Sequence, residues 1–344
     1  MRHYTIPIFV PHLGCPCQCS FCNQKTITGV MPMSPTIAKM QIEEHLSTIP
    51  SDSTAEIAFF GGSFTAIPRE QMIALLRTAQ PYIASGRISS IRISTRPDAI
   101  DKDVLALLKQ YGVNTVELGI QSVSNRVLDA CHRGHTSEDV YRAAKLILSH
   151  GLTLGGQMMI GLPSSTPEDE IATAQAIIDM GAKEARIYPV VVFAGTALAQ
   201  QMADGKYSPL SVEDAVARSA APLELLLDAD VKLLRVGLCE TESLHTAGQI
   251  LGGAYHPALG ELCYSALYLK RICASISQMN LQEHSNLKIS VAPRKLSMAI
   301  GQKRCNYMAI RNRFPTVLLR FAEDPTLIGY AVRVDLIQEM KGSF

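Results

Sequence analysis

Tryptophan is absent from the sequence, and phenylalanine and tyrosine bring the aromatic fraction to only 6%. Aromatic surfaces on which bases could stack are therefore scarce. No stretch approaches the roughly 18 uncharged apolar residues that a membrane-spanning helix requires. Residues 1–14 lack an apolar segment behind a positively charged one, so they do not resemble a secretory signal. We therefore expect a cytoplasmic protein with no membrane partner.

The net charge is also close to zero, with 32 Lys and Arg residues against 31 Asp and Glu residues. This balance hides an uneven distribution. Between residues 265 and 320 the only acidic residue is Glu283, and the local charge is +9, which leaves −8 for the rest of the chain. Such a basic region is typical of a protein that binds a phosphate backbone. A solvated face that balances an acidic remainder is the alternative interpretation.

The first two hundred residues alternate between short apolar runs and segments with helical periodicity. Apolar residues make up 47% of the 344-residue chain, which is typical of globular proteins. The expected strands are residues 6–10, 55–60, 88–94, 113–120, 153–160 and 185–192. Near-continuous apolar strands joined by helical crossovers indicate a parallel sheet covered by helices. The predicted fold class is α/β, a partial barrel of six β/α units, with a small α+β region at the C-terminus.

The character of the chain changes after this alternation. Residues 211–228 and 259–279 have helical patterns, and strand-like runs follow near 287–291, 316–321 and 330–334. We therefore divide the chain into a core barrel (1–210), a helical extension (211–280) and a small basic α+β tail (281–344).

Four of the nine cysteines lie within eight residues, at Cys15, Cys17, Cys19 and Cys22. An odd total with the other five scattered does not indicate a disulfide framework, so metal or redox chemistry is expected. The Cys15-x3-Cys19-x2-Cys22 triad follows the first strand, at the end where parallel barrels place their active sites. Three thiolates can hold three irons of a cubane cluster and leave the fourth iron open. A zinc site that uses all four cysteines is the alternative.

Phe21 precedes the last cysteine of the triad, and further motifs follow in order, most of them at strand ends. They lie at residues 61–65 (GGSFT), 95–98 (TRPD), 117–122 (ELGIQS), 133–136 (RGHT), 158–163 (MMIGLP), 187–189 (IYP) and 195–196 (GT). Together with the triad, this pattern resembles the radical S-adenosylmethionine (radical-SAM) superfamily. Within it, residues 5–210 resemble the radical-SAM domain of the elongator complex catalytic subunit, a family that modifies the wobble uridine of tRNA.

The resemblance implies a [4Fe-4S] cluster on Cys15, Cys19 and Cys22, and S-adenosylmethionine as the second cofactor. Reductive cleavage of S-adenosylmethionine would yield a 5′-deoxyadenosyl radical that abstracts a hydrogen atom from the substrate. The electron would come from a donor such as flavodoxin or ferredoxin. The resemblance also implies seven cofactor-binding residues, which are Phe21, Gly61, Gly62, Ser63, Gln121, Arg133 and Gln157.

The roles of these residues also follow from the resemblance. The segment from Gly61 to Ser63 would approach the amino group of the methionine moiety, and Arg133 would bind its carboxylate, to which a guanidinium fork is suited. Gln121 and Gln157 would bind the ribose hydroxyls. Ser94 stands where the family often has an acidic residue.

The tail carries a second resemblance. A helical pattern at 294–300 leads to Gly301-Gln302-Lys303-Arg304, a second helical piece to residue 313 and a strand at 316–321. This order resembles the core of the KH module, whose Gly-x-x-Gly loop grips single-stranded RNA backbone. Lys303 and Arg304 are therefore the predicted substrate-binding residues. A small helical cap with a basic face is the alternative.

Three functions follow from these patterns. The first is a radical-SAM enzyme that acts on RNA, specifically tRNA. The second is a radical-SAM enzyme that acts on a small metabolite, as the coproporphyrinogen oxidases do. The third is a non-catalytic scaffold that binds an iron–sulfur cluster or zinc. The sequence shows no acetyltransferase segment like that of the elongator subunits, so we do not expect their complete reaction, and no residue is assigned as catalytic.

Overall fold

The computed structural model describes residues 3–10, 15, 19–22, 33–239, 246–282 and 284–337. The chain forms two compact units. The first comprises Met1–Ala215 and Leu225–Pro257, and the second comprises Val216–Glu224 and Ala258–Phe344. Within the described part of the chain, no helix is both long and apolar enough to cross a membrane.

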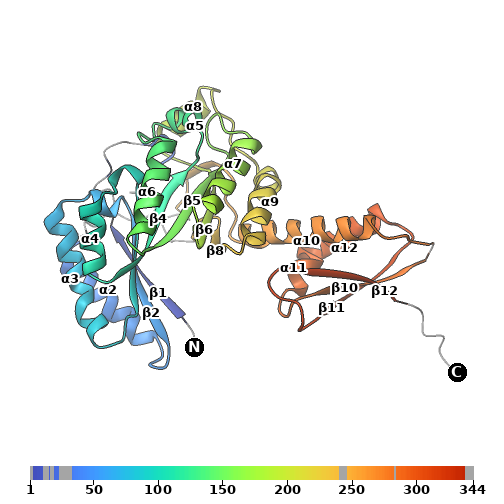
Figure 1. The fold of residues 1–344 in the computed structure, drawn as a ribbon. Coiled ribbons are helices and arrows are strands. Elements are labelled where there is room, and N and C mark those ends of the chain that lie inside the picture. The colour runs from blue at the N-terminus through green and yellow to red at the C-terminus, as the bar shows by residue number, and fades with distance from the viewer. Residues whose placement is uncertain are drawn as a thin grey trace. The chain divides into compact units, whose positions relative to one another are not determined.

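The first unit is built on a seven-stranded sheet in the order β1-β2-β3-β4-β5-β6-β8, and every neighbouring pair is parallel (Figure 1). The strands are β1 (His3–Val10), β2 (Thr54–Gly61), β3 (Ser90–Thr95), β4 (Val113–Gln121), β5 (Thr153–Ile160), β6 (Glu184–Pro189) and β8 (Lys232–Val236). The predicted α/β class with a curled parallel sheet is confirmed, and β8 adds a strand that the sequence pattern did not reveal.

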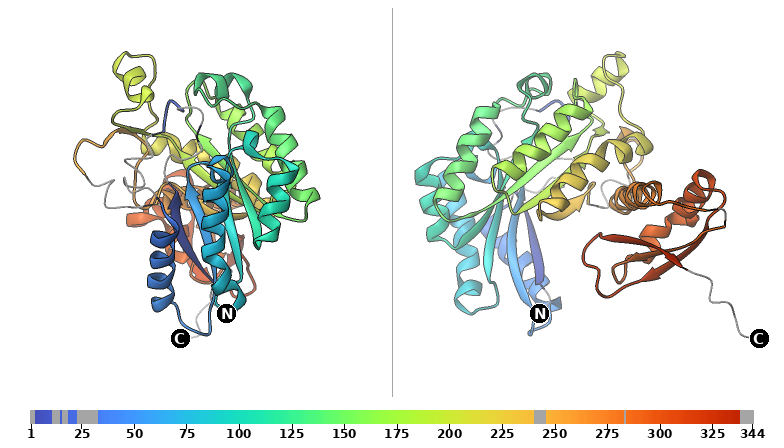
Figure 2. Two further views of the ribbon diagram at one scale, coloured as in Figure 1. Left: turned by 90° about the vertical axis from the view of Figure 1, so that its left-hand side faces the viewer. Right: turned by 45° about the vertical axis from the view of Figure 1, so that its right-hand side comes forward.

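Helices connect successive strands and lie along the sheet (Figures 1 and 2). They are α2 (Pro35–Thr48), α3 (Arg69–Ala84), α4 (Lys102–Gln110), α6 (Ser137–Ser149) and α7 (Pro167–Asp179), with shorter α5 (Asn125–Ala130) and α8 (Ala197–Ala203) and the longer α9 (Val212–Asp228). The starts of α6 and α7 are set by capping boxes, in which Thr136 pairs with Asp139 and Thr166 pairs with Asp169.

The two faces of the parallel sheet differ in character. One face is apolar and packs on the helices; a Cβ built on Gly156 would lie 2.9 Å from Cγ1 of Ile177 in α7. The opposite face carries buried charged residues, among them Arg92 and Glu117, which alternate along their strands with Ile91, Ile93, Val116 and Leu118. This alternation differs from the near-continuous apolar strands expected from the sequence, and it creates a polar interior.

The predicted strand at 185–192 is divided in the structure. β6 ends at Pro189, and β7 (Val191–Phe193) pairs instead with β9 (Ile250–Gly253) in an antiparallel two-stranded sheet. Proline has no N–H to continue a ladder, which explains the break. β9 does not correspond to any of the strands expected from the sequence.

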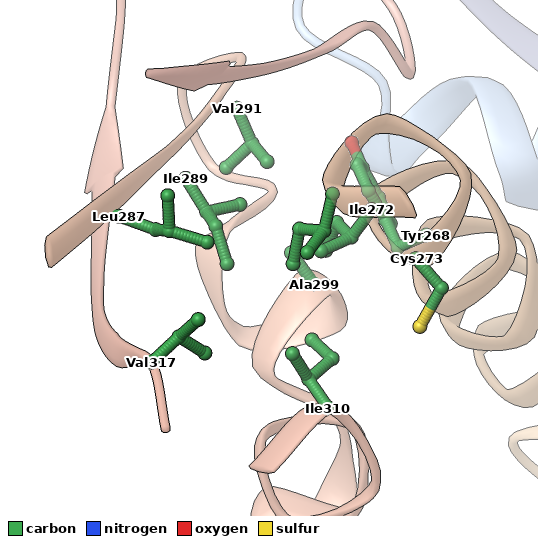
Figure 3. Close-up of a cluster of buried hydrophobic side chains, with 10 residues drawn as sticks. Tyr268, Ile272, Cys273, Leu287, Ile289, Val291, Ala299, Ile310 and Val317 are labelled. Carbon is green, nitrogen blue, oxygen red and sulfur yellow. The ribbon is translucent and has the colours of Figure 1, made fainter. Parts of the chain in front are cut away.

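The second unit has its own sheet and core. α10 (Leu259–Ser277), α11 (Leu296–Ile300) and α12 (Cys305–Arg313) accompany β10 (Asn286–Val291), β11 (Leu318–Glu323) and β12 (Val332–Ile337). The sheet order is β11-β10-β12, with β10 parallel to β11 and antiparallel to β12. Ile289, Ile310 and Val317 are buried with Tyr268 and Ile272 of α10 (Figure 3). The predicted α+β region at the C-terminus is confirmed.

Candidate functional site

The cysteine segment lies after β1, at the carboxyl end of the parallel sheet. Cys19 is buried, and Cys15 and Cys22 are half-buried. The backbone around Cys19 is anchored, because Ser20 N–H donates to the Cys131 carbonyl at 2.9 Å and its own carbonyl accepts from Leu198 N–H at 2.8 Å. Cys17 lies outside the described residues. Among the described residues, no group of three or more His, Cys, Asp or Glu side chains is arranged to hold a metal ion.

Two of the three cysteines nevertheless contact residues that were predicted to bind S-adenosylmethionine. Sγ of Cys19 accepts a hydrogen bond from Nη1 of Arg133 at 3.2 Å, and Sγ of Cys15 lies 3.7 Å from Oγ of Ser63. Ser63 and Arg133 come from segments 70 residues apart and are 2% and 8% exposed. The structure therefore brings the predicted cluster ligands and the predicted cofactor residues to one place.

The turn after β2 is tight and depends on glycine. Gly61 has a φ of +108°, and a Cβ there would lie 3.0 Å from the carbonyl oxygen of Val10 in β1. Gly62 N–H donates to that same carbonyl at 2.9 Å, so this N–H is already used. A methionine amino group would therefore be met by the carbonyl groups of this segment. Carbonyls suit it, because an amino group is itself a hydrogen-bond donor.

Arg133 and Gln121 have buried polar atoms that no described residue satisfies. Nη2 of Arg133 donates to the Gly119 carbonyl at 2.8 Å, but within the described part of the chain its Nε has no hydrogen-bond partner, and neither has Oε1 of Gln121. Unsatisfied buried polar atoms are uncommon and costly, so their presence fits a polar ligand at this position. A guanidinium beside a thiol suits a carboxylate, and a carboxamide suits a hydroxyl, so the donor set fits S-adenosylmethionine.

Gly119 also belongs to this site, although its role was not predicted from the sequence. A Cβ at this position would lie 2.7 Å from Nη2 of Arg133 and 3.1 Å from Nε2 of Gln121. The β4–β5 register shifts between Gly119 and Gln121, and Gln121 has a φ of +67°. A bulge of this kind re-aims a side chain at a strand end. Its place as the glycine inside the motif at 117–122 is the sequence signal from which its role could have been predicted.

His135 is buried behind this site and is 3% exposed. Burial lowers the pKa of its imidazole to about 4, and the positive charges of Arg133 and Arg96 act in the same direction. The imidazole is therefore neutral at pH 7. A neutral imidazole adds no charge of its own beside Arg133.

Gln157 lies deeper in the sheet, on β5. Its Nε2 donates to Oγ of Ser94 at 3.1 Å and to Oε2 of Glu117 at 2.9 Å. Glu117 also pairs with Arg92 and Arg186. Burial lowers the pKa of both arginines, but neighbouring groups outweigh it and raise the pKa: the carboxylates of Glu184, Glu117 and Glu56 for Arg92, and Tyr188 and Glu117 for Arg186. None of the three charged residues Glu117, Arg92 and Arg186 was predicted from the sequence to belong to the site.

Phe21, Cys22 and Gln121 line a largely apolar pocket. The other walls come from Met159, Tyr188, Pro189, Val191, Phe193 and Leu238. An apolar pocket with a few polar groups at its edge is the usual form of a small-molecule site.

Lys303 and Arg304 lie in the second unit, in the turn between α11 and α12. Both are exposed and both have left-handed backbone angles, with φ of +51° and +65°. Gly301 begins the turn, and a Cβ there would lie 2.5 Å from Sγ of Cys305. Asn306 holds the turn, because its Nδ2 donates to both oxygens of Ser265 and to the Ala299 carbonyl.

Comparison with known proteins settles the family. The sequence model of the Radical SAM superfamily matches residues 9–177, and the model of the Radical_SAM C-terminal domain matches residues 182–269. The chain belongs to the radical SAM superfamily. The cofactors of these enzymes are a [4Fe-4S] cluster and S-adenosylmethionine, so the predicted enzyme class and cofactors are confirmed. The assignment of individual residues to them stays a prediction.

Curated relatives include an uncharacterized protein, MJ0486, of Methanocaldococcus jannaschii, which is 27% identical over 59% of this chain and 61% of its own length. The tRNA uridine(34) acetyltransferase of the same organism is 31% identical over 53% of this chain and 33% of its own. The heme chaperone HemW of Mycobacterium tuberculosis is 24% identical over 56% of this chain and 51% of its own. The matched region thus spans less than two thirds of each relative.

Among solved structures, the archaeal Elp3 of Methanocaldococcus infernus superposes with a TM-score of 0.59 at 22% identity. The superposition covers 78% of this chain and 63% of the archaeal chain. This likeness shows that the fold is shared.

Proposed function

We propose that this protein cleaves S-adenosylmethionine reductively at a [4Fe-4S] cluster held by Cys15, Cys19 and Cys22, and that its substrate is RNA, specifically tRNA. The bound cofactors would supply one electron to the sulfonium and a 5′-deoxyadenosyl radical that takes a hydrogen atom from the substrate. Two observations carry the proposal: Arg133 contacts Cys19, and the buried Nε of Arg133 has no hydrogen-bond partner among the described residues.

Each residue of the site has a defined task in this proposal. Arg133 binds the carboxylate of the methionine moiety while it contacts the Cys19 thiol, so the cofactor and the cluster ligand are held by one side chain. Gln121 and Gln157 bind ribose hydroxyls, and Phe21 provides an apolar wall for the nucleoside. Burial around Ser63 and Arg133 excludes water, which protects a reactive radical from quenching.

The enzymatic part is tested by anaerobic reconstitution with iron and sulfide, followed by dithionite and S-adenosylmethionine. We expect 5′-deoxyadenosine to form, and we expect Cys19→Ala to abolish it. Cys305→Ala, which changes an exposed cysteine of the second unit, is the matched control and keeps the wild-type yield. Absence of 5′-deoxyadenosine from the cluster-loaded wild type would leave only the scaffold interpretation.

The RNA part is supported by the basic second unit and by relatives that are named tRNA uridine(34) acetyltransferases. A lysine and an arginine that contact phosphates release counterions, so their removal weakens binding and lowers its salt dependence. We expect the double variant Lys303→Ala/Arg304→Ala to reduce the slope of log K against log salt by about 1–2. Lys39→Ala/Arg142→Ala removes the same charge from exposed positions of the first unit and is expected to have little effect.

A small metabolite is the second candidate substrate, because other relatives are named heme chaperone HemW. The same cleavage assay separates the two candidates. RNA is supported if tRNA stimulates 5′-deoxyadenosine formation, and the metabolite is supported if a tetrapyrrole does so while tRNA does not. We further propose flavodoxin or ferredoxin as the electron donor, which is tested by replacing dithionite with either protein and its reductase.

A further inference from the structure

Five charged side chains meet on the polar face of the parallel sheet. We call this set the ionic layer, and its members are Glu56 (β2), Arg92 (β3), Glu117 (β4), and Glu184 and Arg186 (β6). Their side chains are between 1% and 14% exposed. Buried charges are costly unless each is paired and hydrogen-bonded, so the partners of each oxygen and nitrogen decide what the layer can do.

Glu117 stands at the centre of the ionic layer. Its Oε1 accepts from Nη1 of Arg92 at 3.0 Å and from Nη2 of Arg186 at 3.2 Å, and its Oε2 accepts from Nε of Arg186 at 2.7 Å. The facing residue on β5 is Gly155, where a Cβ would lie 2.9 Å from Cγ of Glu117. The carboxylate is therefore held on both sides and is 1% exposed.

The remaining hydrogen bond of Glu117 goes to Gln157. A carboxamide has a donor end and an acceptor end, and its neighbours decide which end points where. Nε2 of Gln157 has two acceptors, Oε2 of Glu117 and Oγ of Ser94. In the reversed orientation, the amide oxygen would face an oxygen of the buried carboxylate, and two acceptors form no hydrogen bond. Glu117 therefore holds Nε2 of Gln157 toward the ionic layer and leaves Oε1 of Gln157 available to a ligand.

We propose that Glu117 is a positioning residue that makes Gln157 a hydrogen-bond acceptor for a ribose hydroxyl of S-adenosylmethionine. This inference rests on the proposed function. Glu117 acts through Gln157 and does not itself touch the cofactor, and Arg92 and Arg186 hold it in place. A glutamine fixed in this way accepts from a hydroxyl, whereas an unrestrained glutamine turns either end toward the ligand and loses part of the preference.

The test measures how strongly binding depends on the ribose hydroxyls. Calorimetry on the cluster-loaded protein, without reductant, compares S-adenosylmethionine with its 2′-deoxy and 3′-deoxy analogues. Loss of one hydrogen bond weakens wild-type binding by about tenfold for one of the analogues. The measured quantity is the ratio of the Kd of this analogue to the Kd of S-adenosylmethionine. We expect the ratio to fall to about twofold in Glu117→Gln, in which a donor replaces one carboxylate oxygen, and in Gln157→Ala.

Two further variants separate positioning from general damage. Glu56→Gln removes a carboxylate of the same ionic layer that pairs with Arg92 but does not touch Gln157, and it is expected to keep the wild-type ratio. Glu117→Asp keeps the charge and withdraws the carboxylate from Gln157, so it serves if Glu117→Gln does not fold, and its ratio should also fall.

A folded Glu117 variant with the wild-type ratio overturns the inference, as does a Gln157→Ala variant that keeps the ratio. An equal loss of the ratio in Glu56→Gln also overturns it, because the effect would then belong to the whole ionic layer. If the cluster-loaded wild type does not bind S-adenosylmethionine at all, the proposed function fails as well, and that outcome is distinct from the other three.

Discussion

Single residues at the candidate site are constrained by how closely the backbone segments approach one another. Gly61 and Gly119 are both positions where a methyl group would meet a neighbour, the Val10 carbonyl in the first case and the Arg133 guanidinium in the second. Arg133, in turn, links Cys19 to Gly119. The site therefore depends on small residues as much as on charged ones, and substitutions at the glycines test the packing directly.

Gly61→Ala should destabilise the protein by about 2–3 kcal/mol, because the new Cβ would be strained at a φ of +108° and would press on the Val10 carbonyl. Gly86→Ala is the matched control. Gly86 has a φ of +74°, but a methyl group there would meet nothing within 4 Å, so we expect only about 1 kcal/mol from the backbone strain. Urea unfolding followed by circular dichroism measures both, and equal losses would show that the close contact is relieved by movement of the turn.

His135 should make the stability depend on pH. Its pKa of about 4 in the folded state lies below the ordinary value of 6.5, so the unfolded chain binds the proton first. Stability is therefore full above pH 6.5 and falls by about 2–3 kcal/mol as the pH drops toward 4. His135→Gln should remove this part of the slope, whereas His45→Gln, at an exposed position, should not. Urea midpoints measured between pH 7 and 4.5 give the dependence of stability on pH for each variant. The same dependence in His135→Gln as in the wild type would contradict the prediction.

At the scale of elements, the helices are set by local signals and the sheet by distant ones. α7 begins where Thr166 and Asp169 satisfy each other's backbone N–H groups, and that information is contained in four consecutive residues. The ion pair of Arg92 with Glu184 joins residues 92 positions apart and exists only after β3 and β6 have taken their places in the sheet. The first residues of helices can therefore be predicted from the sequence more easily than the partners of side chains in the sheet.

Thr166→Ala should cost about 1 kcal/mol, because Oγ1 of Thr166 accepts from Asp169 N–H at 3.3 Å and the first turn of α7 would lose this partner. Ser149→Ala removes a hydroxyl from the exposed last turn of α6, where it donates to the Leu146 carbonyl, and is expected to be nearly neutral. Thermal unfolding compares the two variants. Equal effects would indicate that the cap contributes nothing beyond a surface hydroxyl.

The sequence predicted the six strands β1 to β6 and the order of helices between them, because alternating apolar runs and helical periodicity are local patterns. β8 was missed because Lys232–Val236 (KLLRV) is short and two of its five residues, Lys232 and Arg235, are charged. The site was partly predictable. The cysteine triad, Gln121, Arg133 and Gln157 stand in recognisable motifs, whereas Gly119 and the ionic layer depend on strand register, which no local pattern contains.

The whole molecule consists of two units that do not follow one another simply along the chain. The stretch Val216–Glu224, in the middle of α9, belongs to the second unit although it precedes part of the first. Within the second unit, Glu224 pairs with Lys270 and Arg271, and Ser219 hydrogen-bonds to the buried thiol of Cys263. The second unit therefore needs a segment that lies more than 30 residues before α10.

A pair of fragments tests this arrangement. Residues 211–344 contain α9 and should fold more stably than residues 258–344, because the shorter fragment leaves Cys263, Lys270 and Arg271 without their partners on α9. We expect a difference of about 1–2 kcal/mol in urea unfolding, from one buried hydrogen bond and the lost ion pairs. Equal unfolding midpoints would mean that α9 does not contribute to the second unit.

The ionic layer has a consequence for how the chain finds its fold. Seven parallel strands with similar apolar faces could pair in more than one alignment, and a shift by one residue would exchange the two faces of a strand. Such a shift in β3 would turn Arg92 toward the apolar helices and place Ile93 among the carboxylates. A guanidinium left there without a counter-charge would cost several kcal/mol, so the shifted alignment is less stable than the one in the structure. The buried charges thus favour one alignment for the four strands that carry them, β2, β3, β4 and β6.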